Sequence, residues 1–364
     1  MLSRRDFGLS TLTTLAAGSA LGAASIRYNE VQWHDVSGWG VEGKGWDDTA
    51  RFYDRLPARA EGVVPGPVWN LSRFSAGMSA FFRTDATDIH LRYSLRSDRL
   101  AMRHVSATAV SGIDLYAQHH GKWRWAAVAQ PDRLNFSRRV AADLDRPDAP
   151  RDWRLYLPLF NGIERLEVGV PSGASFEPVP PRDEQPILCY GTSILHGSGA
   201  SRPGMNWPSI LGRRLDTPVL NLGFAGNGRM EREVAELFAE IDATVFVLDC
   251  APNMWGDMID DRCTTFVRVL RDARPDMPIV MVEGRRYGHD WIRASLRERN
   301  ANNDAALQRA YSTLRDSGVD NLHYVAADAL PSDGDTMIDG SHPNDLGMTM
   351  YADAIAPVIQ RVLS

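Results

Sequence analysis

Short runs of alternating apolar and polar residues characterise the first half of the chain. They occur at residues 79–83, 89–95, 113–116, 123–125 and 166–170, with turn-forming residues between them. Alternation with a period of two is typical of strands that bury one face. Residues 25–170 are therefore predicted to form an antiparallel β-sandwich.

From residue 187 onward the pattern changes to buried strands that alternate with helices. Continuous apolar runs lie at 187–190, 219–222, 245–248, 279–282 and 322–325, and helical periodicity lies at 207–215, 230–241, 264–273, 305–317 and about 346–362. Fully apolar strands with intervening helices indicate a parallel, doubly wound sheet with both faces covered. Residues 187–364 are thus predicted to form a second, α/β domain, and the Pro-, Gly- and Ser-rich residues 171–186 a linker.

The first residues are typical of an export signal. Arg4 and Arg5 form a twin-arginine pair, an apolar Ala-, Leu- and Gly-rich stretch follows, and small residues at 22–24 offer a cleavage site. A disordered arm that carries two arginines is the alternative. We expect residues 1–24 to be a twin-arginine signal peptide, which would make the mature protein periplasmic or extracellular. Later apolar runs are too short to span a bilayer, so no stable membrane anchor is expected after cleavage.

Composition narrows the possible partners. The 364 residues carry a net charge of −6, and no basic stripe is visible, which argues against a nucleic-acid partner. No group of residues has metal-ligand spacing, so neither a metal nor another cofactor is expected. Ten Trp residues, most of them in the first half, fit core packing or a sugar-stacking surface.

Polar, Gly-containing segments follow the first three predicted α/β strands, and another precedes the last helix. They contain Ser193, Gly226, Asn253 and the pair Asp339 and His342. Parallel sheets bind ligands at the carboxyl ends of their strands, so these segments should meet at one edge. Each segment alone has a plain structural explanation, such as a turn or a helix cap.

Together these residues supply every part of acyl-transfer chemistry. Ser193 is the candidate nucleophile, His342 the base, and Asp339 the group that orients it. The backbone N–H groups of Ser193 and Gly226 and the side-chain amide of Asn253 could form an oxyanion hole.

These segments resemble the motif blocks of the SGNH/GDSL hydrolase family. Residues 191–194, Gly-Thr-Ser-Ile, match its nucleophile block, with Thr192 where Asp is commoner, and Gly226, Asn253 and Asp339-x-x-His342 match the other blocks. Residues 112–116, Gly-Ile-Asp-Leu-Tyr, resemble the GxDLY motif of the β-rich domain that precedes one subgroup of these enzymes. The resemblance implies a flavodoxin-like, three-layer α/β/α catalytic domain with a five-stranded parallel sheet and a metal-free Ser-His-Asp mechanism.

Four further residues are candidates for substrate contact. His196 lies three positions after the nucleophile, Arg202 could hold an anionic or sugar group or tie down its loop, Trp255 could form a wall of the site, and Glu283 ends the fourth strand. Asp114 is expected to be structural, because an Asp at a strand edge often caps a turn.

The sequence therefore predicts an exported serine esterase that hydrolyses carboxylic esters, with short acyl groups such as acetyl on a carbohydrate or similar extracytoplasmic molecule as the expected substrate. The choice of a carbohydrate as substrate is based on analogy between folds, because no residue of the predicted site specifies it. An acyltransferase that uses the same acyl-enzyme, and a non-catalytic carbohydrate-binding protein, are the alternatives. Acyl chain length, oligomeric state and the role of the β-sandwich are not specified by any motif.

Overall fold

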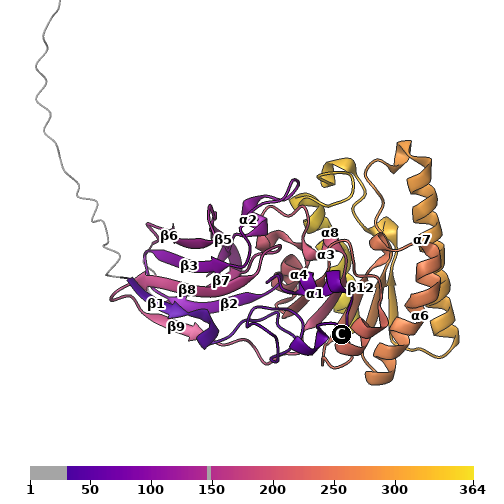
Figure 1. Cartoon of the computed structure of the whole chain (residues 1–364), viewed down its shortest axis with the longest axis horizontal. Coiled ribbons are helices and arrows are strands. Elements are labelled where there is room, and N and C mark those ends of the chain that lie inside the picture. The colour runs from indigo at the N-terminus through magenta and orange to yellow at the C-terminus, as the bar shows by residue number, and fades with distance from the viewer. Residues whose placement is uncertain (1–30, 146–148) are drawn as a thin grey trace, which may run out of the picture.

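The computed structural model describes residues 31–145 and 149–364, and it divides into a β-rich half and an α/β half that lie side by side (Figure 1). The predicted signal peptide lies outside the described residues and stays a prediction. Within those two ranges, no helix is long and apolar enough to cross a membrane.

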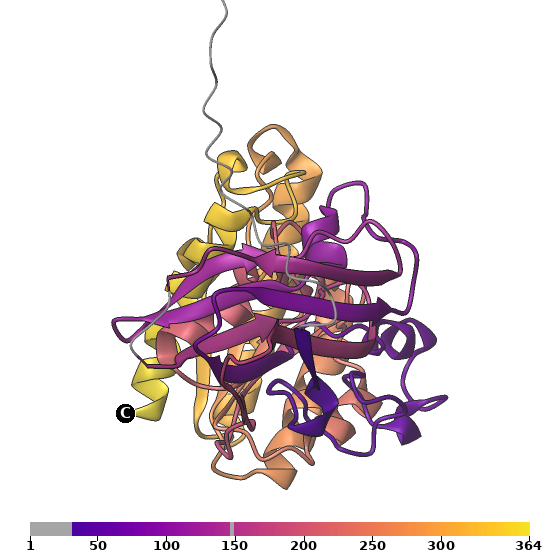
Figure 2. The same ribbon diagram turned by 90° about the vertical axis from the view of Figure 1, so that its left-hand side faces the viewer.

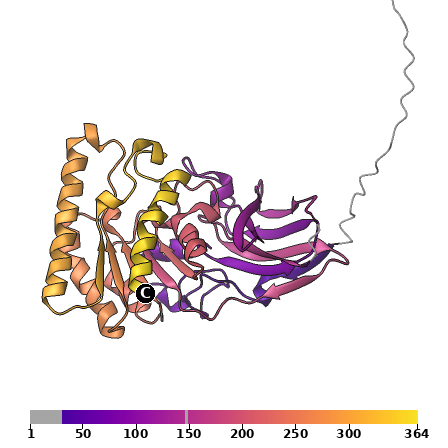
Figure 3. The ribbon, with the colours of Figure 1, turned by 180° about the vertical axis from the view of Figure 1, so that it is seen from behind.

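The α/β half is built on a five-stranded parallel sheet in the order β11-β10-β12-β13-β14. Helices α4 and α8 pack on one face, with core residues such as Trp207 and Tyr351, and α5, α6 and α7 cover the other face around Phe246 and Phe266. In Figure 3 the sheet lies between α8, on the side of the β-rich half, and the long α6 and α7 at the far end of the molecule. The predicted three-layer α/β/α fold is confirmed. The strands are β10 (Ile187–Gly191), β11 (Val219–Gly223), β12 (Val245–Asp249), β13 (Ile279–Val282) and β14 (Leu322–Val325), and the helices are α3 (Ser193–His196), α4 (Trp207–Leu215), α5 (Arg232–Phe238), α6 (Gly256–Ala273), α7 (Ala294–Asp316) and α8 (Asp345–Leu363).

The β-rich half is a sandwich of two antiparallel sheets, as predicted. The sheets have the orders β1-β8-β3-β6 and β5-β4-β7-β2-β9, and their inner faces share a core that includes Phe82, Tyr93 and Trp153. Figure 2 views the sandwich strands in front of the α/β half. The strands are β1 (Val31–Asp35), β2 (Ser79–Thr84), β3 (Ile89–Leu95), β4 (Asp114–His119), β5 (Lys122–Val128), β6 (Asn135–Ala141), β7 (Arg151–Tyr156), β8 (Ile163–Pro171) and β9 (Phe176–Val179), and two short helices are α1 (Gly66–Ser72) and α2 (Ala107–Val110).

Two features differ from the expected division of the chain. Strand β9 lies inside the predicted linker and pairs with β2, so part of residues 171–186 belongs to the sandwich. The segment that contains α1 leaves the sandwich and packs on the α/β core, where Trp69 lies in the same cluster as Leu222 and Phe238. The guanidinium of Arg55, in this segment, is buried and donates to the carbonyl oxygens of Asn221 and Gly223.

The residues that resemble the GxDLY motif join the two halves. Asp114 Oδ2 accepts a hydrogen bond from the backbone N–H of Gly204 (3.0 Å) and lies 3.2 Å from Arg202 Nε, and its Oδ1 accepts from Trp125 Nε1 (2.8 Å). A side chain at Gly204 would contact the Tyr116 ring at 2.5 Å, so glycine is needed there. Asp114 is structural, as predicted, but it binds the backbone of the other half of the molecule instead of capping its own turn.

Candidate active site

The candidate nucleophile lies where the chain turns sharply from β10 into α3. Gly191 ends the strand, and a side chain there would collide with the carbonyl of Asp249 on the neighbouring strand. Thr192 is buried and caps α3, with its Oγ1 accepting from the N–H of Ile194 at 3.3 Å. The Thr that departs from the family block thus shapes the turn that presents Ser193, which is partly exposed.

Ser193, His342 and Asp339 form a continuous hydrogen-bonded chain. Ser193 Oγ lies 2.9 Å from His342 Nε2, and His342 Nδ1 lies 2.8 Å from Asp339 Oδ2. The other carboxylate oxygen, Oδ1, accepts the backbone N–H groups of Ser341 (2.9 Å) and His342 (2.8 Å), which fixes the carboxylate. A neutral His342 with its proton on Nδ1 donates to Asp339 and leaves Nε2 free to accept from Ser193.

The electrostatics of the pair suit a general base. Burial lowers the pKa of His342 below its ordinary value, and His104 and Arg285 act in the same direction, against the raising effect of Asp339. Burial alone would raise the pKa of Asp339, but hydrogen bonds from His342 and Ser341 hold it below its ordinary value. At neutral pH the site therefore holds an ionised carboxylate and a neutral imidazole, the protonation states that a Ser-His-Asp base requires.

The three predicted oxyanion donors come from three adjacent loops. Ser193 supplies the first N–H of α3. Gly226 is exposed, has a positive φ of 71°, and has open space where a Cβ would lie. Asn253 Nδ2 donates one hydrogen to the carbonyl of Asn227 (2.7 Å), which joins the second and third loops, and a second amide hydrogen remains for a ligand. The assignment of these three groups as oxyanion donors stays a prediction.

Helix α7 holds the loop of Asn253 in place. Asn303 Nδ2 donates to the carbonyls of Ala251 (3.2 Å) and Met254 (3.0 Å), and Arg299 donates to the carbonyls of Pro252 (2.9 Å) and Met254 (3.2 Å). These four bonds fasten the loop to α7, so the amide of Asn253 projects from a fixed backbone.

The position of His196 contradicts a role in substrate contact. Its side chain is fully buried, Nε2 bonds to the carbonyl of Leu159 (2.6 Å), and the ring stacks on Phe160 at 4.2 Å between centroids. Burial lowers the pKa of His196 well below its ordinary value, so the ring is neutral and donates to that carbonyl. His196 faces the sandwich and docks α3 against it.

Glu283 and Arg202 also have structural partners. Glu283 is buried, and it accepts hydrogen bonds from Tyr324 Oη (2.6 Å), Gln308 Nε2 (2.8 Å) and the N–H of Ala327 (2.7 Å). The predicted substrate contact of Glu283 is therefore corrected to a strand-end anchor. Arg202 is paired with Asp114, as described above, which favours the expectation that it ties down its loop.

Trp255 is the remaining candidate for substrate contact. Its side chain is 50% exposed, only two residues after Asn253, and the guanidinium of Arg299 lies 5.2 Å from the centroid of its ring. An exposed indole beside the predicted oxyanion hole is suited to contact an acyl group or a sugar ring.

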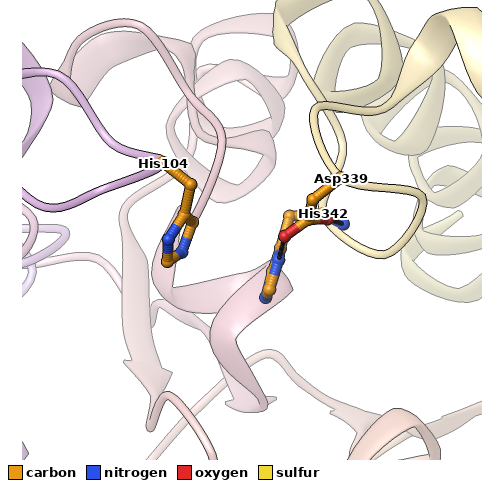
Figure 4. A group of neighbouring side chains, drawn as sticks. All are labelled: His104, Asp339 and His342. Carbon is orange, nitrogen blue, oxygen red and sulfur yellow. Dashed lines mark hydrogen bonds and ion pairs between the residues drawn. The ribbon is translucent and has the colours of Figure 1, made fainter.

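Two residues beside the triad, His104 and Arg285, were not predicted from any sequence pattern. The imidazole of His104, from the sandwich, lies face to face with that of His342, with centroids 5.3 Å apart and an angle of 24° between planes (Figure 4). Arg285 donates to Ser341 Oγ (3.2 Å), within the loop that carries the Asp–His pair. Both lie far from the motif blocks along the chain, and only the folded arrangement brings them to the site.

Two family models match the chain, one for each half. Residues 184–360 match the GDSL-like lipase/acylhydrolase family, and residues 31–176 match the N-terminus of SGNH-hydrolase-type esterases. No curated protein matches the chain.

Solved structures match over almost the whole chain. A protein described as a GDSL-like lipase from Bacteroides ovatus is 32% identical, with a TM-score of 0.86 over 92% of this chain and 98% of its own. A salicylyl-acyltransferase from a tetracycline biosynthetic pathway is 19% identical, with a TM-score of 0.71 and the same coverage. An acetyl xylan esterase from the rumen bacterium Butyrivibrio proteoclasticus is 12% identical, with a TM-score of 0.59 over 91% of this chain and 99% of its own. The last two similarities establish a shared fold.

Proposed function

The chain belongs to the GDSL-like lipase/acylhydrolase family of ester hydrolases, and we propose that it cleaves short acyl esters through an acyl-enzyme on Ser193. The observation that carries the proposal is the unbroken chain from Ser193 Oγ through His342 to Asp339, with contacts of 2.9 and 2.8 Å.

Acylation begins when His342 Nε2 takes the proton of Ser193 as Oγ attacks the ester carbonyl. The positive charge that forms on the imidazole is stabilised by the carboxylate of Asp339. The carbonyl oxygen becomes an oxyanion, to which the N–H groups of Ser193 and Gly226 and the amide of Asn253 donate. Collapse of this intermediate breaks the C–O bond, and His342 returns the proton to the leaving alcohol.

Deacylation repeats these steps with water. His342 Nε2 takes a proton from water, the resulting hydroxide attacks the acyl-enzyme, and the same donors hold the second oxyanion. The proton then returns to Ser193 Oγ as the free acid leaves. The lowered pKa of His342 supports this role, since the base must be neutral at the start of both halves.

We propose an acylated carbohydrate outside the cytoplasm as the substrate, with acetyl as the preferred acyl group. The acetyl xylan esterase shares the fold and acts, by its name, on an acetylated polysaccharide. The exposed Trp255 offers a surface on which a sugar ring could stack. Export by the twin-arginine route, proposed from residues 1–24, would bring the enzyme to such substrates.

Acyl transfer to an alcohol is the second candidate reaction. It is favoured by the fold shared with the salicylyl-acyltransferase, and its chemistry differs only in the acceptor of the second step. The side chain of His342 is 19% exposed, which leaves the base within reach of solvent and supports water as the acceptor.

A substrate screen tests both reactions. The protein and its Ser193→Ala variant would be assayed on 4-nitrophenyl esters of increasing acyl length and on acetylated and deacetylated xylan, with and without added alcohols. We expect Ser193-dependent release of acetate, fastest for the shortest acyl group. Acyl product on the alcohol in preference to free acid would establish transfer, and no Ser193-dependent turnover of any ester would reject the proposed function.

A further inference from the structure

The loop that carries His104 is fixed beside the candidate active site. Met102 and Val105 exchange backbone hydrogen bonds (3.0 and 3.4 Å), which places His104 at the third position of a four-residue turn. Val105 is buried in a small core with Ala200 and Phe160, so the turn is anchored immediately after the histidine. His104 itself is exposed.

Hydrogen bonds connect this loop to the loop of His342. Ser106 Oγ and Thr108 Oγ1 both donate to the carbonyl of Ser201, at 3.0 and 2.6 Å. Ser201 in turn donates its N–H and its hydroxyl to the carboxylate of Asp345, at 2.8 and 2.6 Å. Asp345 begins α8, three residues after His342. The two histidines are thus held by one continuous set of contacts.

The ring arrangement indicates stacking rather than shared metal binding. Potential ligand atoms of His104, Asp339 and His342 lie within 4.8 Å of one another, a spacing that is compatible with metal binding. The two imidazole planes are only 24° apart and face each other (Figure 4), however, and the lone pair of an imidazole nitrogen lies in the plane of its ring. Nearly parallel planes direct these lone pairs side by side instead of toward one point.

We propose that His104 is a positioning residue for the catalytic base: its ring covers one face of His342 and keeps that ring in the plane that reaches both Ser193 and Asp339. This inference rests on the proposed function. It assigns the β-sandwich a part in the reaction, because the residue comes from that half of the molecule.

The charges around His342 define the expected effect. Asp339 bonds to it and favours the cation, whereas Arg285 and His104 lower the pKa of His342, and Ser193 is its neutral partner. The active form has a neutral His342, so the acid limb of kcat/KM follows its pKa. Replacing His104 with a neutral ring should therefore raise the pKa of His342 and move the acid limb to higher pH. Coulomb's law for unit charges at the 5.3 Å centroid separation, in the dielectric of water, gives a shift of about half a pH unit.

Two substitutions separate the stacked ring from its charge. His104→Phe keeps a flat ring without a charge, so we expect the acid limb to move up while kcat on the plateau stays within about twofold. His104→Ala removes the ring as well, which exposes His342 to water and frees its orientation, so we expect a further upward shift and a plateau lower by about fivefold. Arg103→Ala, a charged neighbour in the same turn, is the matched control and should change neither.

The same comparison can be made without activity. Protein labelled with ¹³C-histidine, its His342 signal assigned with a His342→Gln variant, gives the titration of His342 directly by nuclear magnetic resonance. An upward shift in His104→Phe supports the proposal, even if no ester were turned over and the proposed function failed. Unchanged titration of His342 in both His104 variants, or an equal shift in Arg103→Ala, would overturn it.

Discussion

Asp114 in the sandwich accepts a hydrogen bond from the backbone N–H of Gly204 in the α/β half, at 3.0 Å. The Asp114 carboxylate is buried, and Arg202 and Trp125 supply its remaining partners. This contact fastens the loop before α4 to the sandwich, next to the segment that holds Ser201. The two halves therefore form one structural unit around the candidate site.

Asp114→Ala should destabilise the fold by about 2–4 kcal/mol at neutral pH, because it leaves a buried N–H, an indole and a guanidinium without their acceptor. The free energy of unfolding from urea titration measures this loss. Asp152→Ala removes a partly exposed surface ion pair with Arg83 and should cost less than about 1 kcal/mol. Equal losses in the two variants would mean that the contact does not hold the halves together.

The stability that Asp114 contributes should also depend on pH. Burial raises the pKa of Asp114 to about 6, even though Arg202 opposes that effect. A raised pKa means that the folded state favours the protonated form of Asp114. The contribution of Asp114 to the free energy of unfolding is therefore complete below pH of about 4, which is the pKa expected in the unfolded chain. This contribution falls as the pH rises through about 6. The stability difference between wild type and Asp114→Ala should thus be larger at pH 4 than at pH 8. A difference that grows with pH would contradict this assignment.

Asn253→Ala should lower kcat by about 10²–10³ with little change in KM, because an oxyanion donor acts mainly on the transition state. Asn302→Ala, an exposed amide on α7 close to the same loop, provides a matched control and should leave kcat unchanged. Steady-state kinetics on one activated ester distinguishes the roles. A change in KM alone would make Asn253 a substrate-binding residue.

Asp339→Ala should keep about tenfold more activity than His342→Ala. Asp339 orients the imidazole and stabilises its charge, whereas His342 moves the proton in both half-reactions, and the buried His196 lies too deep to replace it. The comparison requires kcat/KM for both variants on one activated and one natural-type ester. Equal or greater loss in Asp339→Ala, with an unchanged thermal melt, would show that the carboxylate does more than orient the base.

Chelators should leave the activity unchanged. The proposed mechanism gives both ring nitrogens of His342 to the triad, and the rings of His104 and His342 do not direct their lone pairs to one point. The measurement is ester hydrolysis before and after dialysis against EDTA. A loss of activity that added zinc or calcium restores would reveal a metal requirement.

The sequence predicted the parts of the structure that depend on local pattern. Strands β10, β12 and β13 are buried along their whole length and are therefore almost entirely apolar. Strand β3 alternates over its second half because Arg92 and Ser94 lie on a partly exposed face. Strand β6 was missed because it carries mostly polar, exposed residues, including two adjacent arginines. Its position is fixed by pairing with β3, which no local pattern records.

The candidate site was predictable where short motifs carry its residues. Ser193, Asp339 and His342 each occur in a block at a strand end or before a helix, and the fold brings the blocks together. His196 was misplaced because sequence spacing alone could not show that its face of α3 packs on Phe160. His104 was missed because a single histidine in a polar turn has no pattern, and its contact with His342 depends on how the two halves dock.

Covalent labelling by a fluorophosphonate shows whether Ser193 is the catalytic nucleophile. The protein would be treated with the reagent, digested, and analysed by mass spectrometry for the modified residue, alongside the Ser193→Ala variant. We expect one adduct, on Ser193, together with loss of ester hydrolysis, and a fall of about thousand-fold or more in activity for the folded variant. An unlabelled Ser193 in active protein, or more than a tenth of the activity retained by Ser193→Ala, would contradict it.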